Sequence, residues 1–580
     1  MNVFLFLLVA IIAFILASRF YGRYIARSIG EDPEHPTPAQ LINDGRDYVP
    51  TKSYVVFGHH FSSIAGAGPI LGPTIAILYG FIPAWLWVIL GGIFIGAVHD
   101  FTALFISMRE GGKSMAVIAR KTLGKAGFNL FIMFTILMIV LVTSSFLSAT
   151  AISLTSLLPL KDIGVNEEST FLKTMVVNGV TMGNIGGIAA MSVVIITLCS
   201  PILGWLIYRR RVKPYLAHIL AVIVCAVSVL ISIQYPVTLS KNIWMIIISV
   251  YVLFAAGWPV WIILQPRDFI NAHILYFGII LMFFSILLTG FSGLTITAPY
   301  FNLADGVQHL GFLWPMMFIT IACGAISGFH SLVAGGTTGK QLMNECGARN
   351  VGYNAMLLES ALAVCVLIAI GVGLNFNDYK ALVWPAEAGV VSNPILAFSR
   401  AAGRLFYQGL KIPLALGTVV GILLIGGFII TTLDTTIRLN RYLFEELWSI
   451  LFKTPPAIMR SFWFNSALSV VLMWIFSYTN AFSTLWPIFG TANQLLAALG
   501  LIAVSAWLLL KGKKYYFALI PAIFMVATTM ASLLILLKNY VSSSNYILIV
   551  TDVLLLLLAV AVIVLAAKRF WNPAPVEGQV

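Results

Sequence analysis

Apolar segments long enough to cross a lipid bilayer recur along the whole 580-residue sequence, and this pattern constrains the fold more than any other feature. Sixty per cent of the residues are hydrophobic, 9% carry a charge, and the mean hydropathy is +0.97. A soluble domain carries about 25% charged residues, whereas about 20 apolar residues form a helix that spans the hydrocarbon core. The composition therefore predicts an all-α, polytopic helical membrane protein.

The hydrophobic runs predict about fifteen spans in a single integral membrane domain, residues 1–580. The first run, Val3–Ala17, has no Lys or Arg before it and no small-residue cleavage site, so we interpret it as a retained span rather than a signal peptide. We expect a first half at about 53–290, a second half at about 313–508, and accessory spans at 515–567.

The net charge of +13 is explained by membrane topology. With the N-terminus outside and the C-terminus in the cytoplasm, 26 of the 34 Lys and Arg residues lie inside and the other eight outside, as the positive-inside rule requires. Arg209–Arg211, Lys568 and Arg569 are among those inside. We therefore expect no nucleic-acid partner. The five cysteines show neither metal-ligand spacing nor a disulfide framework.

Two predicted spans, 53–80 and 313–335, contain residues that interrupt helices. The first includes Phe57–Pro69, whose two adjacent histidines, three glycines and proline are poor material for a continuous membrane helix. The second includes the related stretch Phe329–Thr337. An even number of predicted spans separates them, so they cross the membrane in opposite senses. This arrangement predicts an inverted-repeat transporter core with discontinuous helices; the alternative is a pair of kinked helices packed through small residues.

Irregular backbone at membrane depth is tolerated only where it is buried or lines a cavity, and freed helix N-termini offer N–H groups to anions. The segment Trp486–Gln494 predicts a further break, whose two amides either bind substrate or fasten adjacent helices. We expect the substrate-binding residues to be His59, His60, Phe61, Ser62, Ser63, Gly66, Gly68, Ser327, His330, Ser331, Gly335, Gly336, Thr337, Thr338, Asn493 and Gln494.

Histidines and carboxylates inside spans suit proton coupling, because histidine exchanges a proton near neutral pH and intramembrane carboxylates are costly to keep. The candidates for proton coupling are His59, His60, His330, His99, Asp100 and Glu359. A single membrane histidine also serves as an interhelical hydrogen bond, and we expect Asp434 to pair with Arg438 one turn later. No cysteine or paired carboxylate shares the histidine segments, so neither a metal site nor another cofactor is expected. Gly335–Gln341 lacks the register of a phosphate-binding loop.

Seven segments together resemble the carbon starvation protein A (CstA) family of bacterial membrane transporters. They are Asp47–Thr51, Phe57–Pro73, Gly96–Asp100, Leu264–Asp268, Ala322–Leu332, Thr431–Arg438 and Trp486–Gln494. The resemblance implies a multi-pass protein of the bacterial cytoplasmic membrane that serves nutrient uptake when carbon is scarce. It further implies peptide uptake or proton-driven pyruvate import, and a core like the inverted repeat of amino acid–polyamine–organocation transporters.

We therefore expect a secondary active transporter, not an enzyme, that imports a small carboxylate-bearing nutrient by proton symport during carbon starvation. Its partners are then the substrate (a short peptide or pyruvate), protons and the lipid bilayer. A cation or metal transporter is one alternative. A membrane-embedded metalloenzyme or nutrient sensor built on the His/Asp residues is another.

Overall fold

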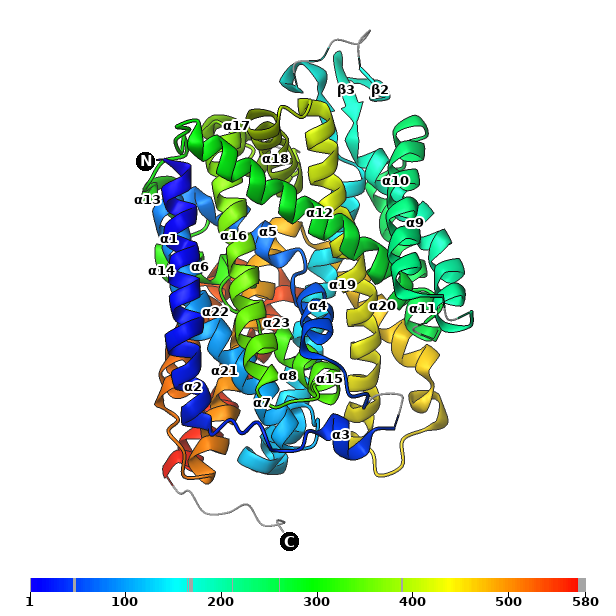
Figure 1. Ribbon diagram of the computed structural model, residues 1–580. Coiled ribbons are helices and arrows are strands. Elements are labelled where there is room, and N and C mark those ends of the chain that lie inside the picture. The colour runs from blue at the N-terminus through cyan, green and yellow to red at the C-terminus, as the bar shows by residue number, and fades with distance from the viewer. Residues whose placement is uncertain are drawn as a thin grey trace.

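The computed structural model describes residues 2–44, 48–163, 165, 170–210, 212–259, 261–386 and 390–571, and within them it is almost entirely helical (Figure 1). Asp47 and Arg211 lie outside the described residues. Twelve described helices are long and apolar enough to span a membrane, and the bent pair α4–α5 adds a thirteenth span. The other two predicted spans correspond to the shorter α11 and to α14 with α15, so the count of fifteen stays a prediction.

The first helices run between two ends of the molecule, called here the upper end, where the N-terminus lies, and the lower end, where α3 lies (Figure 1). Their bounds are α1 Val3–Leu16, α2 Gly22–Ile29, α3 Pro38–Ile42, α4 Ser53–Ile64, α5 Gly68–Ala76, α6 Phe81–Gly91, α7 Ala97–Arg109 and α8 Met115–Leu154. The 40-residue α8 contains a kink at Gly124, whose positive φ of 81° only glycine adopts at low cost.

The middle of the chain begins with a small antiparallel sheet at the upper end, in the order β1-β3-β2. Its strands are β1 Leu157–Pro159, β2 Thr174–Val177 and β3 Val180–Asn184. The helices that follow are α9 Ile185–Tyr208, α10 Pro214–Gln234, α11 Lys241–Gly257, α12 Leu264–Phe291, α13 Leu303–His309, α14 Leu313–Thr320, α15 Phe329–Gly336 and α16 Asn354–Gly373.

Two helices, α17 Phe376–Val383 and α18 Pro394–Leu410, lie across the upper end (Figure 1). Asn393 caps α18 through the N–H of Leu396 and donates to Ser156, which ties the helix to the end of α8. The remaining helices are α19 Leu414–Leu451, α20 Phe462–Thr479, α21 Phe482–Leu510, α22 Tyr516–Ser542 and α23 Tyr546–Trp571.

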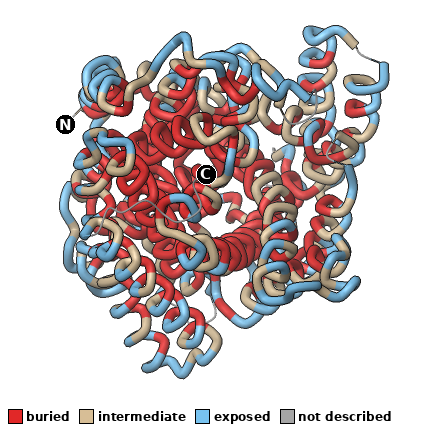
Figure 2. The backbone as a smooth tube through the Cα atoms, turned by 90° about the horizontal axis from the view of Figure 1, so that it is seen from below, coloured by how far each residue is buried: buried red, intermediate tan, exposed pale blue. Residues whose placement is uncertain are grey.

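Burial separates an inner from an outer set of helices. The most apolar window of α21 is 89% buried, and that of α8 is 83% buried, whereas only 22% of the corresponding window in α10 is buried. Figure 2 shows the buried residues gathered in the middle and the exposed ones at the rim. Both interruptions, residues 65–67 and 321–328, are buried, so they lie in protein rather than in lipid, as unpaired backbone at membrane depth requires. Of α4, by contrast, only Val56, His60, Phe61 and Ile64 are buried.

Candidate functional site

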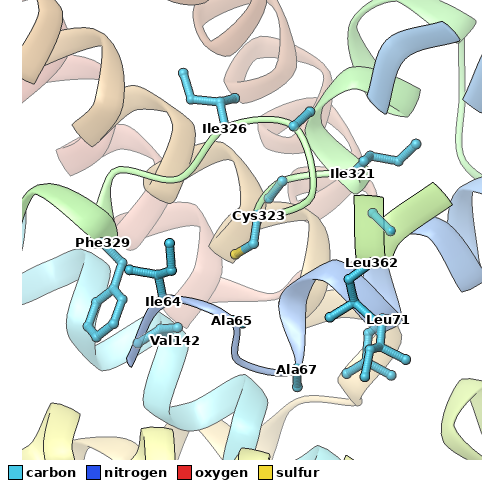
Figure 3. Packing of buried hydrophobic residues seen from close by; sticks show 14 of the residues in the cluster. Ile64, Ala65, Ala67, Leu71, Val142, Ile321, Cys323, Ile326, Phe329 and Leu362 are labelled. Atoms are coloured by element: carbon cyan, nitrogen blue, oxygen red, sulfur yellow. The ribbon is translucent and has the colours of Figure 1, made fainter. Parts of the chain in front are cut away.

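Two broken membrane segments form the centre of the molecule. The first is interrupted at Ala65–Ala67, and the chain bends by 47° between its two helices. The second is interrupted over a longer stretch, because α14 ends at Thr320 and α15 begins only at Phe329. Figure 3 shows Ala65 and Ala67 of the first break near Cys323 of the second.

The two broken segments cross in antiparallel fashion. A Cβ placed on Gly72, after the first break, would lie 2.9 Å from the carbonyl of Thr320, before the second break. Gly68 lies against the side chain of Cys323 with no room for a Cβ. On the other side, His60 of α4 contacts Thr338, which follows α15. Residues late in one segment therefore meet residues early in the other, and the predicted opposite senses are confirmed.

Four predicted residues form one buried group, which we call the histidine cluster: His99, Asp100, His330 and Glu359. Asp100 bridges the two histidines, with Oδ1 2.8 Å from Nδ1 of His99 and Oδ2 2.7 Å from Nδ1 of His330. The other ring nitrogen of His330 lies 3.4 Å from a carboxylate oxygen of Glu359. The cluster thus joins α7, α15 and α16, and all four side chains are buried.

Several polar atoms of this cluster have no hydrogen-bond partner among the described residues. They are Nε2 of His99, Nε2 of His330 and both carboxylate oxygens of Glu359. Buried polar groups in proteins are nearly always paired, so these four atoms make the histidine cluster a candidate site for a proton or a ligand.

The adjacent histidines of α4 have different surroundings. His60 is buried, and its Nδ1 lies 2.9 Å from the hydroxyl of Thr338. His59 is exposed, and its carbonyl accepts hydrogen bonds from Ser62 at 2.9 Å and Ser63 at 2.8 Å. The structure therefore places His60 at the crossing of the two segments and does not bring His59 into the histidine cluster.

The second break is fastened to α21. The amide of Asn493 accepts from the backbone N–H of Phe329 at 3.0 Å and donates to the hydroxyl of Ser327 at 3.1 Å. Gln494 donates to the carbonyl of Phe318 at 2.6 Å. The predicted break at Trp486–Gln494 is wrong, because α21 continues through it. Pro487 lies in the second turn of that helix, where it removes one backbone hydrogen bond, and the contacts of Asn493 and Gln494 with the second broken segment hold the helix in place.

The remaining predicted residues lie along the same segments. Phe61 is buried and stacks on Phe57 with ring centroids 6.4 Å apart, so it packs rather than faces solvent. Gly66 lies beside Thr432 of α19. Ser331, Gly335, Gly336 and Thr337 all lie on or directly after α15.

A cavity of about 500 Å³ lies between α8, α15 and α19, toward the lower end. Its wall includes Leu332 and Gly336 of α15, Thr135 of α8, and Tyr442 and Glu446 of α19. Leu332 is two residues from His330, so the cavity reaches the helix that carries the histidine cluster. At the upper end, by contrast, α5 is fully buried, and Tyr379 of α17 donates to the carbonyl of Ile75 at 3.0 Å.

A second buried charged group, which we call the arginine cluster, consists of Tyr251, Arg267, Asp268 and Asp434. Arg267 of α12 donates to Asp434 of α19 and to the hydroxyl of Tyr251 at 2.5 Å. The predicted pairing of Asp434 with Arg438 is wrong, because the guanidinium of Arg438 instead donates to the carbonyls of Ala255 and Trp258 near the end of α11.

Sequence reasoning missed Arg267, Asp268 and Tyr251 as site residues. Arg267 and Asp268 belong to the segment Leu264–Asp268, and charged residues within an apolar span are a functional signal in their own right. Tyr251 carried no such signal.

Comparison with known proteins identifies the family. The chain matches the family "Carbon starvation protein CstA" over residues 2–395 and 374–532. The chain belongs to this family. The peptide transporter CstA of Campylobacter jejuni is 31% identical over 89% of this chain and 78% of its own length. The pyruvate/proton symporter BtsT of Escherichia coli is 29% identical over 88% of this chain and 78% of its own length.

Solved structures of two other transporters are similar at low identity. A mutant of the manganese transporter of Eremococcus coleocola is 11% identical, with a TM-score of 0.47 over 91% of this chain and 98% of that chain. MhsT in complex with L-phenylalanine is 14% identical, with a TM-score of 0.44 over 89% of this chain and all of that chain.

The relatives from Campylobacter jejuni and Escherichia coli are transporters, and each matches this chain over most of both sequences. The described residues also contain many helices long and apolar enough to span a membrane. This CstA-family protein is therefore a multi-pass membrane transporter and not an enzyme.

Proposed function

We propose that this protein imports a small carboxylate-bearing nutrient, a short peptide or pyruvate, by symport with protons. The names of its CstA-family relatives support these two substrate classes. The single observation that carries the proposal is the antiparallel crossing of two broken segments, with ionisable side chains at the crossing. Broken helices near the bilayer midplane are where secondary transporters bind substrate and coupling ion.

In this proposal the substrate carboxylate is held where the segments cross, by freed backbone N–H groups and by hydroxyls such as those of Ser327 and Thr338. The coupling proton is carried by the histidine cluster and by His60. Asp100 holds two histidines at once, so adding or removing a proton changes the charge of a buried network and biases which end of the molecule opens.

The lower end is the cytoplasmic end, because the orientation that places it there puts 26 of the 34 Lys and Arg residues inside. In this orientation the cavity of about 500 Å³ faces the cytoplasm, while α17 and α18 cover the opposite end. The structure then corresponds to an inward-facing state of a carrier that exposes its centre to one side at a time.

One observation bears on the metal-transporter alternative. In the part of the chain that the structure describes, no group of three or more His, Cys, Asp and Glu side chains is placed to hold a metal ion.

The test is uptake into proteoliposomes under an imposed pH gradient, comparing labelled pyruvate with labelled di- and tripeptides. We expect saturable uptake of one of these classes that a protonophore abolishes. His330→Ala should abolish it, whereas His309→Ala, at an exposed position on α13, should leave it unchanged. Uptake that ignores the pH gradient, or that persists in His330→Ala, contradicts the proposal.

A further inference from the structure

The guanidinium of Arg267 is fully buried, but only one of its three nitrogen atoms makes a hydrogen bond to a described residue. Its Nη1 donates to Asp434 and Tyr251, whereas Nε and Nη2 have no partner among the described residues. These two atoms carry the parallel N–H bonds that bind a carboxylate in bidentate fashion.

Arg109 provides an example in which the same two donor atoms bind a carboxylate. Its Nε and Nη2 hold the two carboxylate oxygens of Glu345, with Nη2 2.7 Å from Oε2. Arg267 presents the same two donors in a more buried place, and neither of them has a partner among the described residues. The open pair therefore has the geometry of a carboxylate receptor.

The arginine cluster contains one arginine and two carboxyl groups. Asp268 interacts electrostatically with Arg267 and Asp434 and is hydrogen-bonded to Thr431. Oδ1 of Asp434 and Oδ1 of Asp268 have no partner among the described residues. A buried cation surrounded by acids accepts a further anion only if one of these acids gives up its charge.

The cluster lies beside the first break. Asn271 of α12 donates to Thr431 at 3.1 Å, and the next residue of α19, Thr432, has its hydroxyl 3.0 Å from a Cβ placed on Gly66. A substrate at the crossing of the broken segments is therefore separated from the arginine cluster by a single turn of α19.

We propose that the open donor pair of Arg267 is a second carboxylate-binding station on the transport path, and that Asp434 leaves the guanidinium as a protonated acid when the substrate carboxylate binds. This inference rests on the proposed function. The charges balance: an Arg267–Asp434 ion pair, a carboxylate anion and one proton give an Arg267–carboxylate ion pair and neutral Asp434. Each carboxylate therefore brings one proton, and the net charge of the cluster does not change.

Four groups face Asp434, and they allow it to leave Arg267 as a protonated acid when a carboxylate binds. They are Tyr251 of α11, Arg267 and Asp268 of α12, and Arg438 of α19 itself. The guanidinium of Arg438 is directed to the end of α11, where its Nη2 donates to the carbonyls of Ala255 and Trp258, and its Nε has no partner among the described residues. Of these two arginines, Arg267 is the one whose adjacent donors Nε and Nη2 both lack a partner among the described residues.

The experiment measures how steeply substrate accumulates with the pH gradient in proteoliposomes, with the membrane potential clamped at zero. Labelled pyruvate or labelled dialanine is used, whichever the wild type takes up. A tenfold gradient in proton concentration multiplies accumulation by ten for each proton coupled. We expect Asp434→Asn to lower accumulation at this gradient tenfold relative to wild type while substrate exchange across the membrane persists. Unchanged accumulation in Asp434→Asn overturns the inference.

A charge-neutral double variant distinguishes binding from a structural ion pair. Arg267→Gln/Asp434→Asn removes both charges, so a purely structural pair predicts recovered exchange, and that result overturns the inference. We expect exchange to be lost at least tenfold in this variant, although the protein stays folded by size-exclusion chromatography and thermal melting. The matched control is Arg109→Gln/Glu345→Gln, which removes an occupied pair and should leave the accumulation ratio unchanged.

Infrared difference spectroscopy supplies a measurement that does not depend on the folding of the single variants. Adding substrate to wild type should produce the carbonyl band of a newly protonated carboxylic acid, and the double variant should lack it. Absence of the band from wild type overturns the inference. Failure of the proposed function is a different result, since wild type would then show no uptake driven by the pH gradient.

Discussion

The histidine cluster and the arginine cluster place carboxylates beside cationic side chains in different ways. In the first, Asp100 lies between two histidines, a residue type that occurs both neutral and positively charged in proteins. In the second, Asp434 is paired with Arg267, which keeps its charge throughout the physiological range. The first cluster can therefore change its charge in place, whereas the second keeps its cation and exchanges that cation's partner when Asp434 takes up a proton. In our proposal the first cluster handles protons alone, whereas the second handles a carboxylate together with one proton.

The largest expected effect is that of Asp100→Asn. Removing one partner of a buried charged network costs about 3–5 kcal/mol, and about 1.4 kcal/mol corresponds to a factor of ten. We expect the initial rate of pH-driven uptake in proteoliposomes to fall about 10²–10³-fold, with exchange lost as well. Asp434→Asn should keep exchange, so equal loss of exchange in both variants would break the distinction between the clusters.

Gly68→Ala tests the crossing that lies near both clusters. Its Cβ would overlap the side chain of Cys323, and overpacking of this kind costs about 1–3 kcal/mol. We expect a lower melting temperature in detergent and reduced uptake, both partly restored by Gly68→Ala/Cys323→Gly. A single variant as stable as wild type would show that the two segments do not touch there.

Asn493→Ala should affect the histidine cluster and leave the arginine cluster unchanged, because Asn493 contacts the start of α15. The substitution leaves the N–H of Phe329, at the start of α15, without its acceptor, at a cost of about 1–2 kcal/mol. Because α15 carries His330, we expect a shifted pH dependence of uptake together with a modest loss of thermal stability. A shift in apparent affinity for the carboxylate with no change in pH dependence would point to the arginine cluster instead.

The smallest expected effect concerns Glu31, outside both clusters. Burial raises the pKa of Glu31 from 4.5 to about 6, against the opposing charge of Arg349. The folded protein then binds more protons than the unfolded chain between these two values, so stability falls as the pH rises from 4.5 to about 6.

Glu31→Gln should remove this fall in the melting temperature, and Glu34→Gln, at an exposed position, should retain it. The variant thereby separates the pH dependence of the melting temperature, which arises at Glu31 near the lower end, from the pH dependence of transport. A melting profile identical to wild type in Glu31→Gln would assign the response to another group.

The sequence predicted the elements whose signals are local. The glycines and prolines of Phe57–Pro69 indicated the break between α4 and α5, and the apolar runs indicated the spans. It also selected His330, Asp100 and Glu359, although not their mutual contacts, because 230 residues separate the first two. Such pairings depend on how helices pack, which no local pattern records.

Two sequence predictions were wrong, the Asp434–Arg438 ion pair and the break at Trp486–Gln494, because contacts between helices outweighed a local preference. Asp434 and Arg438 have the one-turn spacing of a helical ion pair, but the carbonyls that end α11 attract Arg438 and leave Asp434 to Arg267. Likewise, Pro487 and Gly490 suggested a break, yet tight packing of α21 against the second broken segment maintains the helix. In both places the deciding partner comes from a different helix.

The 38 residues of α19 connect the first break, the arginine cluster and the cavity. The helix carries Thr432 beside the first break, Asp434 in the arginine cluster and Tyr442 in the wall of the cavity. It also grips the end of α11 through Arg438 and Arg441. Since Asp434 and Tyr442 lie on one continuous helix, a tilt of α19 that followed a change of ionic partner at Asp434 would also change the width of the cavity toward the lower end.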